Sequence, residues 1–201
     1  MVDAINKNLG TLAECCVGYP FRGAIDSVAS SSVAVVQMKD VSPGSAVNWE
    51  AVVRTDLTGR REPDWLVPGD ILFVARGNHY YAAALSVVPK TAVCGPHLYH
   101  LRLKRGKAVL PGFLAWQINQ PPIQRLLRQA AEGSNQLSIR RAELEALPIG
   151  VPSLADQEHI VRMAETAARE RALLDKLILN RERQLSALAF ALAGAAERSS
   201  K

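Results

Sequence analysis

The stretch RGNHYY (76–81) combines side chains that recognise nucleic-acid bases in different ways. Arginine bonds guanine bidentately, asparagine bonds adenine, and tyrosine stacks on bases or contacts phosphate. The polar loop GSNQLS (133–138) adds two amides suited to the same readout. The alternatives are a polar turn whose tyrosines pack against the domain, and a loop that only caps a helix. The base-contact candidates are Arg76, Asn78, His79, Tyr80, Asn135 and Gln136.

Positive charge is unopposed over a long part of the chain. Residues 71–131 contain no Asp or Glu, whereas the last quarter of the sequence is nearly balanced. Phosphate binding requires unopposed Lys and Arg, so this distribution favours a polyanionic partner over a merely solvated basic face. The unopposed residues are Arg76, Lys90, Arg102, Lys104, Arg105, Lys107, Arg125 and Arg128. The candidates for phosphate contacts are Arg60, Arg61, Lys104, Arg105, Lys107 and Arg128.

Motifs of catalysis and metal binding are absent from the sequence. It has no phosphate-binding glycine loop, no His-x-x-x-His, no Cys-x-x-Cys and no dinucleotide fingerprint. The four histidines are isolated, and we expect His97 and His100 on the surface of a strand. Cys15, Cys16 and Cys94 are expected to be reduced structural thiols. The sequence therefore predicts a protein that is not an enzyme and holds no metal.

The composition limits which classes of protein the chain can belong to. Of 201 residues 48% are hydrophobic, enough for a sizeable core, and the net charge is +5. No apolar run is long enough to span a bilayer, and the N-terminal segment lacks the pattern of a signal peptide. We therefore expect a cytoplasmic protein.

Short strands and then helices must position the candidate residues. Up to about residue 110, apolar runs alternate with turn sequences rich in Gly, Pro, Asn and Asp. These runs predict a barrel-like or twisted sheet in an α+β fold, with a tight turn at VPGD (67–70). Two short helices follow, at LPGFLAWQIN and PPIQRLLRQAA. Ser138 is expected to cap a third short helix reaching about Leu144, and LPIGVP (147–152) returns to extended chain.

A long helix is predicted after residue 152. Ser153 and Asp156 form a capping-box-like start, and no proline follows. Apolar residues at heptad spacing require a helical partner, from this chain or a second copy. The alternative is a helical hairpin around Leu179–Asn180, where no Gly or Pro marks a turn. We expect a domain over 1–152 and a helix over 153–201 whose seam comprises Ile160, Ala167, Leu174, Ile178, Leu185, Leu188 and Leu192.

Four segments resemble the DNA-specificity (S) subunits of type I restriction–modification systems. The most specific is LSIRRAELEALPIGVPSLADQEHIV (137–161), similar to the family's closing signature of Leu-Pro-Ile, Pro-x-Leu-x-x-Gln and a long helix. VPGDILFVARG (67–77) resembles the family's Gly-Asp-Ile-Leu element. LGTLAECCVGYPFRG (9–23) and VVQMKDV (35–41) are weaker matches. The chain departs from the family in size, because full S subunits carry two target-recognition domains and two long helices.

The resemblance implies a non-catalytic subunit that reads DNA. Half-size members dimerise through the long helix, so two domains read a bipartite site in double-stranded DNA, with the helices setting their distance. The implied partners are a methyltransferase subunit and a restriction subunit, which carry S-adenosylmethionine and ATP. The residues that match the family's motifs are Gly69, Asp70 and Arg76 in the domain, and Pro152, Leu154 and Gln157 where the domain joins the long helix. The alternative is an accessory or regulatory protein of another phage-defence complex that reads no defined sequence.

Overall fold

The computed structural model describes residues 5–21, 23–28, 30–44, 46–57, 62–77, 79–132 and 138–199. Contact clustering divides the chain into two units, residues 1–162 and 163–201. The first unit holds three sheets and four short helices; the long helix α5 (Leu154–Ser199) begins in it and continues through the second. The mixed α+β class and the long C-terminal helix are as predicted from the sequence. Among the described residues, no helix is both long and apolar enough to cross a membrane.

The four-stranded sheet is the centre of the first unit. Its order is β2 (Ala13–Val17), β8 (Leu98–Leu103), β5 (Ile71–Val74) and β6 (Tyr81–Ala84), and all its pairs are antiparallel. Every residue of β5 is buried, because Ile71 and Phe73 face one core while Leu72 and Val74 face another. Burial on both faces explains the continuous apolar run ILFV.

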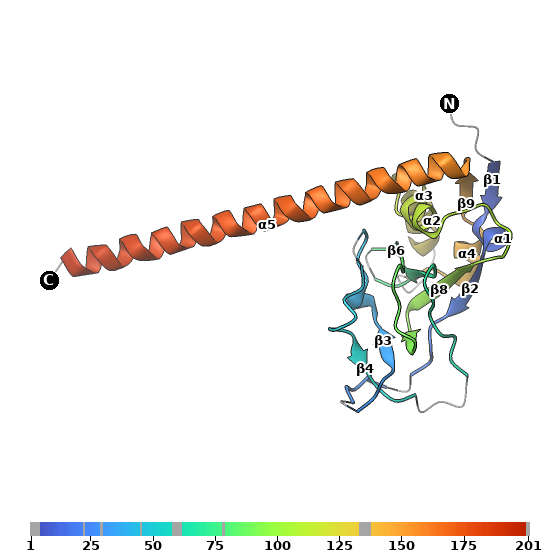
Figure 1. Ribbon diagram of the computed structural model, residues 1–201, viewed down its shortest axis with the longest axis horizontal. Helices are drawn as coiled ribbons and strands as arrows, with labels where there is room; N and C mark the ends of the chain where they lie inside the picture. Colours follow the sequence, from blue (N-terminus) through green and yellow to red (C-terminus); the bar gives the residue numbers. More distant parts are fainter. Residues whose placement is uncertain are drawn as a thin grey trace. The chain divides into compact units, whose positions relative to one another are not determined.

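A layer lies on each face of this sheet. One face packs on helices α1 (Leu9–Leu12), α2 (Pro111–Ile118), α3 (Pro121–Glu132) and α4 (Arg141–Glu145). The other face packs on a three-stranded sheet of β4 (Val53–Arg54), β3 (Ala34–Val36) and β7 (Ala92–Cys94), in which β3 and β7 are parallel. Figure 1 shows α2 and α3 on one side of β6 and β8, with β3 and β4 on the other. The short 3-10 helix η1 spans Met38–Asp40. The strands thus form separate sheets rather than the single barrel-like or twisted sheet predicted.

A third, two-stranded sheet joins the two ends of the domain. β1 (Ile5–Asn8) pairs antiparallel with β9 (Pro148–Val151), from Ile5 opposite Val151 to Asn8 opposite Pro148. The backbone N–H of Leu9 continues this pairing by donating to the carbonyl of Leu147 at 2.9 Å. Helix α5 begins three residues after the end of β9, close to Ile5, which pairs with Val151.

The predicted start of α5 is confirmed. The hydroxyl of Ser153 accepts the backbone N–H of Asp156 at 3.2 Å and donates to the Asp156 carboxylate at 2.7 Å. The helix continues without a break to Ser199, so the alternative of a hairpin around Leu179–Asn180 is wrong. The third short helix is present as α4 and ends at Glu145, close to the predicted Leu144. The predicted cap at Ser138 is wrong, because the helix begins at Arg141 and Ser138 pairs instead with Arg76 in an isolated antiparallel bridge.

Candidate nucleic-acid interface

A pocket of about 240 Å³ opens beside Arg76. Four segments build it: the end of β2, the end of β5, the turn into β8 and the approach to α4. The Arg76–Ser138 bridge and the hydrogen bond from the N–H of Ile139 to the carbonyl of Ala75 (2.8 Å) hold the second and fourth of these segments together. Its polar lining is Arg76, His97, Tyr99, Ser138 and Arg140, and its apolar lining is Val17, Ala75, Leu98 and Ile139. We call this the Arg76 pocket.

His97 adopts an uncommon backbone conformation at the rim of the pocket. Its φ is +72°, a region that residues other than Gly rarely occupy, and its carbonyl accepts the N–H of Ala75 at 3.2 Å. Nη1 of Arg76 lies 3.3 Å from His97 Nδ1 and 3.4 Å from Nε2. A nitrogen almost equally close to both ring nitrogens cannot lie in the ring plane, because it would clash with the carbon between them. Nη1 therefore lies over the imidazole and directs an N–H toward its nitrogens, so the ring holds this end of the guanidinium.

The predicted base-contact residues divide into three groups. Arg76 and His79 are exposed, so base contact by either stays a prediction. Tyr80 is only 5% exposed and belongs to the core beneath the helices, and Tyr81 donates from its hydroxyl to the Val41 carbonyl at 2.7 Å. Both tyrosines thus pack against the domain, which was the alternative for this turn, and Tyr80 is withdrawn as a base contact. Asn78, Asn135 and Gln136 lie outside the described residues.

The predicted phosphate contacts differ in what their charged groups already bind. Arg105, Lys107 and Arg128 are exposed. Lys104 is half-buried and its Nζ donates to the carbonyl of Gly10 at 2.6 Å, so it also joins β8 to α1. Arg60 and Arg61 lie outside the described residues. The contribution of each of these residues to binding stays a prediction.

One arginine of the unopposed stretch is neutralised within the fold. Arg102 donates from Nε to Asp70 Oδ1 (2.8 Å) and from Nη2 to Oδ2 (2.7 Å). Asp70 also accepts the N–H of Val67 at 2.7 Å, and its Oδ2 lies 2.8 Å from His100 Nε2. Burial by itself raises the pKa of Asp70, but the hydrogen bonds from Arg102 and Val67, together with the nearby His100 ring, outweigh it and hold the pKa below its usual value. The same pairing raises the pKa of Arg102.

His100 is part of this buried network and not a strand-surface residue as predicted. It is 2% exposed, because β8 is covered on both faces. Neither of its ring nitrogens has a well-directed hydrogen bond within the described part of the chain, so the short contact to Asp70 is close but poorly aligned. At 2.8 Å between His100 Nε2 and Asp70 Oδ2, the contact is electrostatic.

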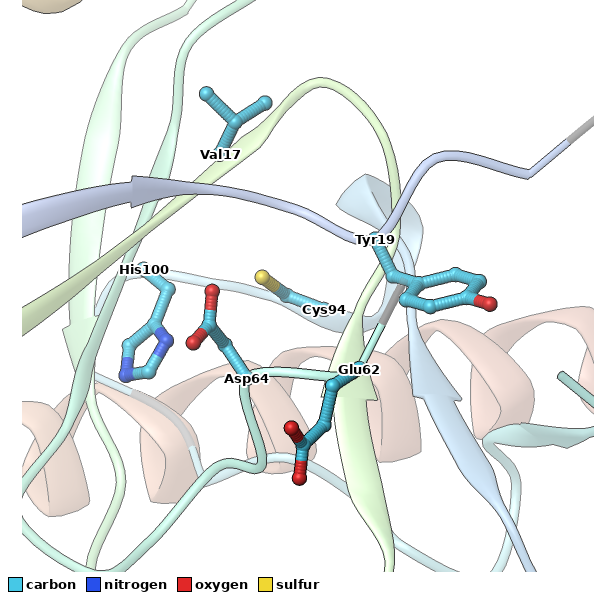
Figure 2. A pocket seen from close by; sticks show the side chains of 6 residues that line it. All are labelled: Val17, Tyr19, Glu62, Asp64, Cys94 and His100. Carbon is cyan, nitrogen blue, oxygen red and sulfur yellow. The ribbon is translucent and has the colours of Figure 1, made fainter. Parts of the chain in front are cut away.

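A second cavity, next to His100, is too small for a ligand. Its volume is about 10 Å³, near the lower limit for one water molecule. Figure 2 shows the Asp64 carboxylate between the His100 ring and the Cys94 sulfur. Burial raises the pKa of Cys94 and of Cys15 to about 12, so both thiols stay protonated. This protonation agrees with the prediction of structural thiols.

Apolar side chains are exposed along α5. Five of the predicted seam residues are among them: Leu174, Ile178, Leu185, Leu188 and Leu192 are each more than half exposed. Ile160 is half-buried and packs on the domain core, and Ala167 is exposed. Met163, Leu173 and Leu177 are exposed as well. At about 100° per residue, they extend the seam into an apolar band roughly 140° wide.

No protein-family model and no curated protein matches the sequence. The structure, in contrast, is similar to solved structures of type I restriction–modification systems. A chain from a study of complex assembly and conformational transition of the type I R-M system matches 92% of this chain with a TM-score of 0.68 and 16% identity. The HsdS subunit of Thermoanaerobacter tengcongensis matches 86% with a TM-score of 0.60 and 15% identity. The S subunit from M. genitalium matches 81% with a TM-score of 0.51 and 16% identity.

The chain has the S-subunit fold. It spans 43%, 39% and 38% of the three matched chains, which is about two fifths of their length. The S-subunit fold explains why the long helix follows directly on a β-rich domain. His97, Ser138 and Arg140 were not singled out as binding residues, since only the folded chain brings them to Arg76; the one signal in the sequence was the family-like segment around Ser138.

Proposed function

We propose that this chain is the non-catalytic DNA-recognition component of a type I restriction–modification complex. The observation that carries the proposal is the similarity over 92% of the chain, with a TM-score of 0.68, to a chain of such a system. In this proposal methyl transfer, S-adenosylmethionine binding and ATP use belong to the partner subunits. The chain itself contributes the recognition of double-stranded DNA.

The distribution of charge supports DNA as the ligand. Arg105, Lys107, Arg125 and Arg128 are exposed, and residues 71–131 supply no carboxylate to oppose them. Asp70, which precedes this stretch, is saturated by Arg102 and its other partners inside the domain. Unopposed cations of this kind gain affinity for phosphates by releasing counterions.

The length of the chain and the band on α5 support a homodimer. One chain corresponds to less than half of each matched chain, so two copies would supply two domains and two long helices. In the proposed dimer the seam residues of α5 pack against those of the second copy. A two-fold dimer reads a bipartite site whose half-sites are inverted repeats.

The width of the apolar band supports a further partner on the same helix. A two-helix seam uses a narrow stripe of heptad positions, whereas a band roughly 140° wide suits contact with more than one helix. Leu173 and Leu177, on one side of the seam, are exposed. We assign this side of the band to the methyltransferase subunit.

The test is modified-base sequencing of the source genome with and without this gene. The expected result is loss of methylation at a single motif made of two inverted half-sites separated by a spacer. Restoration by the wild-type gene is the control. An unchanged methylome in a strain whose methyltransferase is active would contradict the proposal and favour the accessory role.

A further inference from the structure

The Arg76 pocket has the electrostatics of an anion site. Two arginines, Arg76 and Arg140, line it, and none of its lining residues is acidic. The nearest carboxylate in sequence, Glu143, accepts the backbone N–H of Arg140 at 2.8 Å. Ser138 adds a hydroxyl to the lining. The apolar residues Val17, Leu98 and Ile139 complete the lining.

The contact with His97 positions the Arg76 guanidinium in the pocket. The ring holds Nη1, and the guanidinium carries further N–H donors on Nε and Nη2 for an acceptor in the pocket. The backbone strain at His97 places the ring at this position. Strained residues of this kind persist where the surrounding structure fixes them, and they concentrate at binding sites.

We propose that the Arg76 pocket holds one phosphodiester group of the DNA backbone, bound between Arg76 and Arg140, with His97 as the positioning residue for Arg76. This inference rests on the proposed function and names a site within it. Backbone phosphates protrude from a duplex and fit a concave cationic pocket, whereas base edges are reached by side chains that protrude into a groove. Arg76 therefore fixes the register of the domain on DNA rather than reading a base.

The first experiment measures the salt dependence of binding to a duplex of random sequence by fluorescence anisotropy, using the full chain. Each phosphate neutralised contributes about 0.9 to the slope of log K against log salt concentration. We expect the double variant Arg76→Gln plus Arg140→Gln to lower the slope of log K against log salt concentration by about 0.9, because the two arginines share one phosphate. Lys39→Gln, which removes an exposed lysine outside the pocket, is the control and should keep the affinity of wild type.

Two outcomes of this experiment would overturn the proposal. A double variant with the wild-type slope would show that the arginines contact no phosphate. A loss of about twice that amount would show that they bind two separate phosphates. In both cases the wild-type chain still binds DNA, so the proposed function stands while the pocket assignment falls. Circular dichroism of the variants establishes that they are folded.

The second experiment tests the role of His97. His97→Gly keeps the positive φ without strain but removes the ring, so the fold is retained. We expect a several-fold loss of DNA affinity in His97→Gly and no further loss when it is added to Arg76→Gln, because the ring acts only through Arg76. Additive losses would overturn the positioning role.

A titration with inorganic phosphate, followed by NMR of the arginine side chains, separates this site from DNA binding. Phosphate-dependent shifts of Arg76 and Arg140 are expected in the wild type and not in the double variant. These shifts would support the anion site even if the chain bound no duplex, in which case only the proposed function would fall. If the phosphate-dependent shifts were absent and the chain also bound no duplex, the anion site and the proposed function would both be overturned.

Discussion

At the scale of single residues, Asp70 shows how a turn is fixed by side chains far along the chain. The VPGD sequence predicted the turn, and Gly69 has the positive φ (+92°) that such a turn requires. The Asp70 carboxylate accepts the N–H of Val67 across the turn and also binds Arg102 from the neighbouring strand. Local turn chemistry could be predicted, but the partnership with Arg102 depends on strand pairing that the sequence does not display.

Replacing Asp70 by Asn is expected to destabilise the domain by about 2–3 kcal/mol at pH 7, because a charged, buried acceptor of several hydrogen bonds is lost. The pKa of Asp70 is lower in the folded chain than its unfolded value of about 4. Its stabilisation is therefore complete above about pH 5 and is lost as the pH falls through 4 and below. Urea unfolding of wild type and Asp70→Asn should give a difference that narrows below about pH 4. The exposed Asp26→Asn is the control, and a difference that stays constant with pH would contradict the assignment.

The phosphate candidates can be separated by charge reversal. Arg105→Glu plus Lys107→Glu is expected to weaken binding to duplexes of every sequence about tenfold or more and to lower the salt slope by about 1–2. Lys104→Glu should in addition lower the unfolding temperature, because it removes the hydrogen bond to Gly10. Lys39→Glu is the control. Wild-type affinity at low salt in the double variant would exclude these residues from the interface.

At the scale of elements, the first turns of α5 are anchored by the buried amide of Gln157. Its Oε1 accepts the N–H of Leu110 at 2.9 Å, and its Nε2 donates to the carbonyls of Ala108 and Pro152, also at 2.9 Å. The side chain is completely buried. Val161, one turn further along α5, lies next to Gly112 of α2, where an added Cβ would be in ordinary van der Waals contact with the Val161 side chain at 3.4 Å. The start of α5 is thus part of the domain's packing.

Gln157→Ala removes the side-chain partner of the Leu110 N–H and of the Ala108 and Pro152 carbonyls, so we expect a loss of about 2–3 kcal/mol in the free energy of unfolding. Thermal unfolding measures this loss, and hydrogen exchange of the Leu110 amide should accelerate in parallel. Glu158→Ala, at the adjacent exposed position, should change stability by less than about 0.5 kcal/mol. Unchanged protection of Leu110 in Gln157→Ala would contradict the anchoring role.

Patterns confined to one element were predictable, and associations between elements were not. The apolar run of β5, the Ser153 cap and the uninterrupted α5 follow from local periodicity and turn chemistry. The polar segment around Ser138 predicted a helix cap, but in the structure Ser138 pairs with Arg76 and does not cap the helix. The Arg76 pocket could not be predicted for the same reason, because its residues come together only when four segments of the chain pack.

At the scale of the whole molecule, association of two chains would cover the exposed band of α5. Leu174→Asp plus Leu185→Asp places charges in the proposed seam, and we expect monomers because neither carboxylate finds a partner there. Multi-angle light scattering measures the mass. Leu179→Asp is the matched control, because Leu179 is also exposed but lies roughly 140° around the helix from Leu174. A double variant that remains dimeric would show that the seam lies elsewhere.

The pairing of β1 with β9 brings the two ends of the intervening segment together. The chain enters the domain at Leu9 and leaves it at Leu147, and a direct hydrogen bond joins these two residues. A different domain inserted between the same two strands would meet the same two-stranded sheet and the same helix start. Under the proposed function, replacement of the whole segment between β1 and β9 would change what is recognised while keeping the helix proposed to assemble with partners. New specificity would then arise by recombination at two neighbouring points, without redesign of the proposed assembly surfaces.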